Sequence, residues 1–488
     1  MVLRWLLLGT LAVAALGNLG FGLAMILRPD ELRYGEAILY GHAARILDGQ
    51  PLYQPIDQAP YSVAAYTPLY YAAAAGLRVL FGPGFGPGRA LSFVAGLLAV
   101  AVVGCLTWRR TRSRHATLLA CLLFLGLGLP GPIPWFGSYK EDVLGVALAL
   151  GTVAVLDGGT SRRHIWLAAV LAALAMLTKQ TLFGPALGGV IWLAATRRRQ
   201  HAVLFGAIVA VSVVSVCLGL QLSTGAFWEN TVLANLNQLT PEALSFNLLL
   251  LAVFQTAPLL IAVVYVAPRL RRRPDIAVTD LLTGAWLLAF IPVLGLAKEG
   301  ADANYWLLLA AFTAVLVALT LHERERGRGG PLRLAIVANA VFALYLIGGQ
   351  VIRQPSLVRP TAAARAGFER IIDLVRSEPG DVIADPLDVA VLTDHPIVLE
   401  PVLYQLLYLD GHWDPTPVVE RICRGEIGLL VLGYPLELPD AEAAHKWPRP
   451  VLDALRARMT LEEIVPAGLN QRFVYTLDEG ATCGTAYG

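Results

Sequence analysis

Charged and amide side chains gather in a few short segments of this chain, each directly beside a long apolar run. The first segment contains Asp30, Glu31, Arg33, Tyr34 and Glu36. The later segments hold Lys140, Glu141 and Asp142, then Lys179 and Gln180, then Trp228, Glu229, Asn230, Asn235 and Asn237, and finally Lys298, Glu299, Asp302, Asn304 and Tyr305. Carboxylates can act as a general base or hold a divalent metal, whereas lysines can hold a phosphate. If the segments converge, they predict a polar cavity suited to transfer from an anionic phosphate leaving group.

Plainer explanations exist for the same residues. Asp30, Glu31 and Asp142 could each cap a helix, because acidic side chains favour a helix N-terminus. Lys140 and Lys179 could simply extend along apolar surface toward the lipid headgroups. The last segment could be an ordinary hydrated loop.

The composition indicates what kind of protein carries these segments. Of 488 residues, 56% are hydrophobic and 15% are charged, against about a quarter charged in soluble domains. The mean hydropathy is +0.60. We therefore expect an integral membrane protein that crosses the bilayer many times. The net charge of +2 gives no reason to expect a nucleic-acid partner.

A transmembrane helix needs about 20 mostly apolar residues. Eleven segments meet this condition, near 5–27, 89–108, 116–132, 142–157, 164–178, 181–196, 202–222, 246–267, 278–297, 303–321 and 331–350. A twelfth segment, 66–82, is ambiguous.

Arginines resolve the ambiguity, because short cytoplasmic loops are enriched in positive charge. They form five clusters: Arg109, Arg110, Arg112 and Arg114; Arg162 and Arg163; Arg197, Arg198 and Arg199; Arg269, Arg271, Arg272 and Arg273; and Arg324, Arg326 and Arg328. All five lie inside, together with the N-terminus, only if 66–82 is a helix on the outer surface. We therefore expect a multi-pass protein of the inner (plasma) membrane with a cytoplasmic N-terminus. The acid-bearing segments and the C-terminal tail then lie outside.

The composition changes after Gln350, and residues 355–488 are predicted to form a small extracytoplasmic α/β domain following a transmembrane domain of residues 1–350. Val382–Asp385, Ile397–Glu400 and Leu429–Leu432 resemble buried strands, whereas Pro360–Arg376, Thr416–Arg424 and Pro450–Met459 resemble amphipathic helices. The fold class is therefore an all-α polytopic membrane protein with outer-surface helices and an α/β tail. Cys423 and Cys483 lie in the tail and could pair if it faces an oxidising compartment.

Five motifs in order resemble those of the C-type (GT-C) membrane glycosyltransferases, a family that uses polyprenyl-phosphate sugars. Its members include the protein O-mannosyltransferases and the lipid A aminoarabinose transferase. The motifs are Arg28-Pro29-Asp30-Glu31-Leu32-Arg33-Tyr34-Gly35-Glu36; Thr67-Pro68-Leu69-Tyr70-Tyr71 through Leu80-Phe81-Gly82, followed by Arg89; Lys140-Glu141-Asp142-Val143-Leu144; Leu177-Thr178-Lys179-Gln180; and Ala297-Lys298-Glu299 with Tyr305. The resemblance covers about residues 1–320.

This resemblance implies an inverting transfer of a sugar from a polyprenyl-phosphate donor to a glycan, lipid or protein acceptor. Asp30 would be the general base, Glu31 would be a second catalytic carboxylate, and Asp142 would assist the acceptor or a metal. The expected donor-phosphate ligands are Lys179, Lys298, Arg89 and Lys140. The expected substrate contacts are Tyr34, Tyr66, Glu299, Asp302 and Tyr305.

One departure from the family concerns a metal. The aminoarabinose branch has Glu-Lys-Pro before the surface helix, where this chain has Tyr66-Thr67-Pro68. A metal ligand and a phosphate-binding lysine are missing at that point. A divalent metal therefore stays an open expectation without assigned ligands, and no other cofactor is expected.

Two other classes of function compete with the transferase. A transporter or flippase of lipid-linked glycans should place polar groups near mid-bilayer on broken helices, whereas these apolar segments are nearly free of charge. A non-catalytic membrane assembly protein would not need Asp30 or Asp142.

Overall fold

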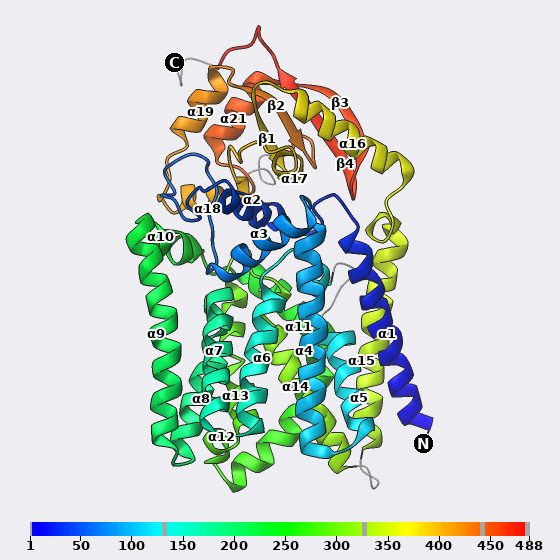
Figure 1. The fold of residues 1–488 in the computed structure, drawn as a ribbon. Coiled ribbons are helices and arrows are strands. Elements are labelled where there is room, and N and C mark those ends of the chain that lie inside the picture. Colours follow the sequence, from blue (N-terminus) through cyan, green and yellow to red (C-terminus); the bar gives the residue numbers. More distant parts are fainter. Residues whose placement is uncertain (1, 129–133, 325–328, 440–444, 484–488) are drawn as a thin grey trace.

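The computed structural model describes residues 2–128, 134–324, 329–439 and 445–483. It consists of a helical bundle with a small α/β domain at one end (Figure 1). The bundle is built from α1 (Val2–Ile26), α4 (Gly86–Thr111), α5 (Arg114–Leu123) with a π-helical turn (Phe124–Gly128), α6 (Asp142–Gly158), α7 (Arg162–Thr178), α8 (Gly184–Ala195), α9 (Arg199–Thr224), α11 (Pro241–Arg272), α12 (Ile276–Thr279), α13 (Leu281–Leu288), α14 (Leu307–Glu323) and α15 (Gly330–Arg353).

Each of the eleven predicted apolar segments contains helix where the structure describes it, although residues 129–132 of the third segment lie outside the described ranges. The segment 278–297 is divided into α12, α13 and a 3-10 helix (Pro292–Ala297). Six helices have the length and composition to cross a membrane, namely Val2–Ile26, Gly86–Thr111, Arg199–Thr224, Pro241–Arg272, Ala303–Glu323 and Gly330–Arg353. The others are shorter. The centre of the bundle is α14, whose residues Leu307 to Leu321 are all buried. The predicted polytopic helical fold is confirmed.

The ambiguous segment 66–82 is a surface helix, as expected. It forms α3 (Leu69–Phe81), which lies across the end of the bundle together with α2 (Glu36–Leu47), beneath the α/β domain (Figure 1). Tyr70 and Tyr71 are buried. Val79, Leu80 and Phe81 are strongly exposed at the end of the helix.

The arginine-rich connections lie at the opposite end of the bundle, together with the N-terminus (Figure 1). Ion pairs join neighbouring helices there, with Arg110 contacting Asp157 and Asp280, and Arg269 contacting Glu323. Arg326 and Arg328 lie outside the described residues. The two ends of the bundle therefore differ in the way that the sequence predicts.

The tail contains α16 (Ala362–Ser377), β1 (Asp381–Asp385), α17 (Asp388–Val391), α18 (Pro401–Leu409), α19 (Thr416–Cys423), β2 (Ile427–Leu432), α21 (Arg449–Arg458), β3 (Met459–Ala467) and β4 (Asn470–Leu477). The sheet order is β1-β2-β4-β3, with β1 and β2 parallel and the other pairs antiparallel. The predicted α/β tail is confirmed, but one strand prediction was wrong. Ile397–Glu400 is a loop whose Leu399 makes one bridge to Tyr61, because its apolar side chains pack against the first outer loop rather than within the sheet.

The tail shares its core with a segment of the bundle's first outer loop. Ile56, Tyr61 and Val63 are buried among Tyr404, Trp413 and other apolar residues of the tail. The hydroxyl of Tyr404 donates to the carbonyl of Ile56 at 3.0 Å. The tail is therefore held against the bundle by packed apolar side chains and not only by the chain that joins them.

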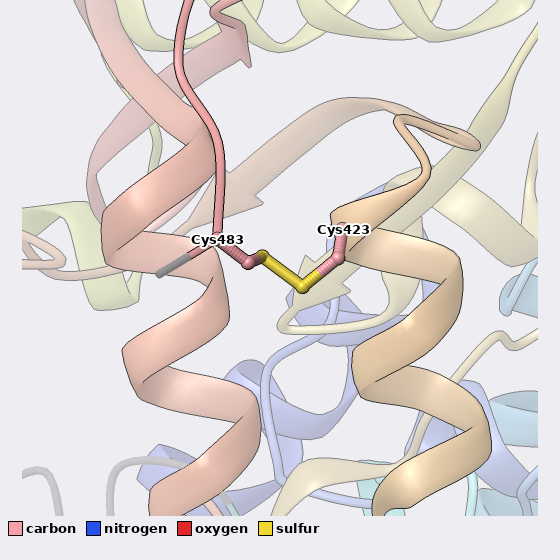
Figure 2. Close-up of a disulfide and its surroundings, with 2 residues drawn as sticks. All are labelled: Cys423 and Cys483. Atoms are coloured by element: carbon pink, nitrogen blue, oxygen red, sulfur yellow. A yellow bond between two sulfur atoms is a disulfide. The ribbon is translucent and has the colours of Figure 1, made fainter. Parts of the chain in front are cut away.

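A disulfide joins Cys423, at the end of α19, to Cys483 near the C-terminus (Figure 2). The two cysteines that the sequence left as a conditional pair are therefore bonded. The bond fixes the chain that follows β4 against α19.

Candidate functional site

The first outer loop is fixed by a buried ion pair between Glu36, at the start of α2, and Arg89 in α4. Nε and Nη2 of Arg89 donate to the Glu36 carboxylate at 3.0 and 2.6 Å. Its other N–H groups donate to the carbonyls of Met25, Arg28 and Asp30. Burial favours a raised pKa for Glu36, but Arg89 outweighs it and the pKa is lowered.

Arg89 is one of the residues that the sequence resemblance implied as a phosphate ligand, and that role stays a prediction. All five of its N–H donors already have protein partners, and its side chain is fully buried. In the structure, Arg89 holds the loop that carries Asp30 and Glu31. Its partner is Glu36, a residue of the first charged segment to which no role was assigned from the sequence.

A second cluster surrounds Lys179 at the outer ends of α6 and α7. These helices form an antiparallel hairpin, so the start of α6 meets the end of α7. Nζ of Lys179 donates to Oε1 of Glu141 at 2.9 Å and to Oδ1 of Asp142 at 2.5 Å. The other carboxylate oxygens, Glu141 Oε2 and Asp142 Oδ2, are buried without a hydrogen-bond partner in the described structure.

Electrostatics in this cluster follow from burial and close charge. Burial opposes the charge of Lys179, but Asp142 and Glu141 outweigh it and raise its pKa. Burial and the neighbouring Asp142 raise the pKa of Glu141. Because one ammonium faces two carboxylates, the cluster has unused acceptor capacity.

Two tyrosines and a second lysine complete the Lys179 cluster. Its Nζ lies 4.9 Å from the ring centre of Tyr66 and 5.7 Å from that of Tyr305. Lys298 lies nearby and donates to Oδ1 of Asn235 at 3.3 Å. Burial and the like charge of Lys179 lower the pKa of Lys298 to about 8. Two lysines held in one another's field favour an anion between them.

Asp30 lies in a different environment. Arg28 contacts both of its oxygens, at 2.9 and 2.6 Å, and both side chains are buried. A Cβ atom placed on Gly468, in the β3–β4 turn, would lie 3.0 Å from Oδ2 of Asp30. The carboxylate therefore sits beneath the tail and is paired, rather than open to a substrate.

Glu31, by contrast, lines a cavity of about 280 Å³ between the first outer loop and the tail, together with Tyr34. Burial, and then the charges of Asp388 and Glu36, raise the pKa of Glu31 to about 8. Tyr34 donates to Oε1 of Glu400 at 3.0 Å.

Lys140 connects the two environments. It is buried, and Nζ packs against Gly35, where an added Cβ would lie 2.4 Å away. Burial raises the pKa of both Glu31 and Glu141, and the charge of Lys140 acts on each in the opposite direction. Lys140 therefore stabilises the charged form of one carboxyl group in each of the two environments.

The remaining predicted residues differ in the contacts that they make. Asp302 accepts from Arg33 at 2.7 Å, and Arg33 lies 4.0 Å above the Trp135 ring. Glu299 is tied through its backbone to Gln238 and Asn237. Arg33 belongs to the first charged segment, but no role was assigned to it from the sequence.

Whether the site could hold a divalent metal depends on which side chains are placed to act as its ligands. Within the described ranges, no group of three or more His, Cys, Asp or Glu side chains is placed to hold an ion. Glu141 and Asp142 come closest, but the ammonium of Lys179 already contacts both carboxylates. These residues do not fit a metal centre.

Comparison with known proteins yields structural similarity only. No family model and no curated protein sequence matches the chain. The crystal structure of ArnT from Cupriavidus metallidurans in the apo state has a TM-score of 0.60 at 14% identity, covering 98% of each chain. The same protein bound to undecaprenyl phosphate has a TM-score of 0.59 at 15% identity, again covering 98% of each chain.

The chain has the GT-C fold. An archaeal oligosaccharyltransferase, AglB from Archaeoglobus fulgidus, solved with an inhibitory peptide and a dolichol-phosphate, is similar at a TM-score of 0.55 and 12% identity. That alignment covers 97% of this chain and 74% of AglB. The similarity to ArnT thus extends over the tail, beyond the residues 1–320 that carry the sequence resemblance.

Proposed function

We propose that this protein transfers a sugar from a polyprenyl-phosphate donor to an acceptor hydroxyl at the extracytoplasmic face of the inner membrane, with inversion. The observation that carries the proposal is the Lys179 cluster. It combines two lysines suited to a phosphate with carboxylate oxygens that have no hydrogen-bond partner among the described residues. Its fold is that of ArnT, one structure of which is bound to undecaprenyl phosphate.

The proposed reaction breaks the bond between the anomeric carbon and the donor phosphate as the acceptor oxygen attacks from the opposite face. The phosphate leaves with the bonding electrons, and Lys179 and Lys298 stabilise its negative charge. Preorganised cations are most effective where charge develops in the transition state. The acceptor proton passes to a carboxylate.

Asp142 fits the role of that base, because its Oδ2 is beside Lys179 and has no partner among the described residues. Asp30, the base implied by the sequence resemblance, is the alternative, and its role requires that the pair with Arg28 opens. The two assignments predict different variants to be inactive.

A direct test uses full-length protein in detergent with undecaprenyl phosphate carrying a radiolabelled sugar, and follows loss of the sugar from the lipid. We expect Asp142→Asn to lose at least about a hundredfold in rate, as for removal of a positioned proton acceptor. Asp157→Asn, at the other end of the bundle, is the matched control and should retain full activity.

Other results would change the assignment. An inactive Asp30→Asn beside an active Asp142→Asn would transfer the base role to Asp30. Absence of turnover with a panel of donors, together with movement of lipid-linked glycan across vesicles, would replace the transferase with a transporter.

We also propose that the N-terminus is cytoplasmic and the tail extracytoplasmic. The arginine clusters at one end of the bundle and the Cys423–Cys483 disulfide in the tail support this orientation. Single cysteines at positions 82 and 110 test it with a membrane-impermeant thiol reagent. Position 82 should react from outside, and labelling of position 110 instead would reverse the topology.

A further inference from the structure

One peptide unit of the first outer loop is held from both sides by buried charged side chains. It links Asp30 to Glu31. On the bundle side, the carbonyl of Asp30 accepts from Nη2 of Arg89 at 2.8 Å. On the tail side, the backbone N–H of Glu31 donates to Oδ2 of Asp388 at 2.9 Å. Because a peptide unit is planar, these two contacts fix its orientation, and with it the position of both side chains, between the two parts of the molecule.

Asp388 is itself fixed within the tail. It lies at the start of α17, shortly after β1, and its side chain is fully buried. Its Oδ2 also accepts from Nη2 of Arg472 in β4 at 2.8 Å, and its Oδ1 accepts from the N–H of Val389 at 2.9 Å. A displacement of the tail therefore displaces the Asp30–Glu31 peptide.

Two further contacts connect the tail to Asp30. Arg28, which pairs with the Asp30 carboxylate, also donates through Nη1 to the carbonyl of Ser356 at 2.5 Å, in the turn between α15 and the tail. Gly468, in the β3–β4 turn, has φ +63° and lies so close that an added Cβ would be 3.0 Å from Oδ2 of Asp30. Both contacts place the carboxylate from the tail side.

Asp388 also acts on Glu31 through its charge. Burial, and then the charges of Asp388 and Glu36, raise the pKa of Glu31 to about 8, whereas Lys140 opposes them. The guanidinium of Arg472 favours the ionised form of Asp388 against the effect of burial on its pKa. An ionised Asp388 disfavours a second negative charge on Glu31. Asp388 therefore influences both where the Glu31 carboxyl group lies and at what pH it ionises.

We propose that Asp388 is a positioning residue of the transferase, through which the tail sets the geometry of the Asp30–Glu31 segment. The inference rests on the transferase proposed above, because the sequence resemblance places catalytic carboxyl groups in this segment. It predicts that the tail affects the rate of transfer without contacting a substrate. The alternative is a structural role, in which Asp388 joins the tail to the bundle and does nothing more.

The first measurement compares kcat and KM in full-length protein in detergent, with undecaprenyl phosphate carrying a radiolabelled sugar. In Asp388→Asn an NH2 group replaces one oxygen, so the side chain cannot accept all three of its hydrogen bonds. We expect kcat at pH 7 to fall at least about tenfold, because small displacements of a catalytic group cost large factors in rate. The KM for the donor should stay within about twofold, because the phosphate is expected to bind at the Lys179 cluster and not at this segment. Asp373→Asn changes an exposed carboxyl group of α16 that is paired with Arg376, and should leave both constants unchanged.

The second measurement is the pH dependence of kcat at saturating donor, which a structural role would not change. Loss of the Asp388 charge lowers the pKa of Glu31, so the inflection of kcat near pH 8 should move to lower pH by about one unit in Asp388→Asn. The direction is the same whether the reaction needs the ionised or the protonated form of Glu31. Glu31→Gln should lack the inflection. The other titratable groups around Glu31 are unchanged in Asp388→Asn; they are Asp30, Tyr34, Glu36, Lys140, Asp385, Tyr434, Lys446 and Arg472.

Gly468→Ala tests the position of Asp30 without altering any charge. Its added Cβ presses on the Asp30 carboxylate from the β3–β4 turn. The kcat should fall, while the inflection near pH 8 stays where it is in the wild type. The two variants together separate the effect of geometry from the effect of charge.

Hydrogen–deuterium exchange gives a measurement that does not need turnover. In Asp388→Asn, peptides that cover residues 29–36 should exchange faster than in the wild type, because the N–H of Glu31 loses its fixed acceptor. Peptides from β2, which lies in the interior of the tail's sheet, should exchange as in the wild type and show that the tail is folded. If Asp388→Asn unfolds the tail, Gly468→Ala decides the question, and an unchanged kcat in that variant overturns the proposal.

The positioning role and the transferase fail separately in these measurements. Wild-type turnover together with an unchanged kcat, or an unmoved inflection, in Asp388→Asn refutes the positioning role alone. Absence of wild-type turnover with every donor refutes the transferase and the positioning role with it. Faster exchange of residues 29–36 in Asp388→Asn would then leave Asp388 as a structural contact between the tail and the bundle.

Discussion

Two buried charge clusters lie at the same end of the bundle, and they differ in how completely they are satisfied. Arg89 and Glu36 use every N–H donor of the arginine and both oxygens of the carboxylate. Lys179 contacts two carboxylates that each retain one unpaired buried oxygen. The first cluster holds the loop in place, and the second has capacity left for a substrate.

The comparison teaches that burial of charge alone does not locate an active site. Both clusters are buried, and each contains a residue that the sequence resemblance implied as a ligand of the donor phosphate, Arg89 in the first and Lys179 in the second. Free bonding capacity separates them, since an unsatisfied buried polar group costs free energy unless a ligand completes it.

The largest expected effect breaks the satisfied cluster. Arg89→Met leaves the Glu36 carboxylate buried without its partner, so the free energy of unfolding should fall by about 3–5 kcal/mol. Thermal unfolding of detergent-purified protein measures this loss. Arg110→Met, whose partly exposed pairs with Asp157 and Asp280 lie at the opposite end, is the control and should lose about 1 kcal/mol or less. A stable Arg89→Met variant that no longer binds donor would confirm Arg89 as a phosphate ligand.

An intermediate case is Glu400, a buried carboxyl at the junction with the tail that accepts from Tyr34 and from the backbone of Val63. Burial raises its pKa from 4.5 to about 7. Between these two pKa values Glu400 is ionised in the unfolded chain but protonated in the folded protein. The free energy of unfolding therefore falls as the pH rises. The loss is roughly 3 kcal/mol across the window and is constant above about pH 7.

Glu400→Gln tests this reasoning because an amide does not titrate. Its oxygen can accept from the backbone N–H of Val63, and its NH2 group can donate to the hydroxyl oxygen of Tyr34. The fall of melting temperature between about pH 4.5 and 7 should be less steep in the variant than in the wild type. Identical slopes in the two proteins would show that Glu400 is ionised in the folded state.

The smallest expected effect is on the Lys179 cluster. Lys298 has a pKa of about 8, so its charge, and the donor affinity that depends on it, should decline above that pH. The KM for the polyprenyl-phosphate donor should rise about tenfold between pH 7 and 9. Lys298→Arg stays charged and should show a flatter profile, whereas Lys298→Gln should show the raised KM at every pH. A rise that persists unchanged in Lys298→Arg would assign it to another group.

Much of the fold could be predicted because it depends on properties of single segments, namely their length, apolarity and positive charge. Length and apolarity mark the helices, and the side preference of arginine placed α3 on the surface. The short β1 and β2 strands were identified from apolar runs. β3 and β4 were missed because polar residues interrupt their apolar runs, as with Glu462 and Glu463 in β3 and Gln471 and Arg472 in β4. Ile397–Glu400 was misassigned because an apolar run does not reveal what it packs against.

Three properties of this chain could be read from its sequence alone: that it is a polytopic membrane protein, which end of it carries the polar segments, and which lysines and carboxylates are candidates for the site. Only the tertiary structure decided which of them remain available. In the sequence, nothing distinguishes Asp30 and Arg89 from Asp142 and Lys179. In the structure, Arg28 donates to both oxygens of Asp30, and Glu36 accepts from Arg89. Such partners come from packing in three dimensions, as does the cavity that Glu31 shares with Arg472, more than 400 residues away.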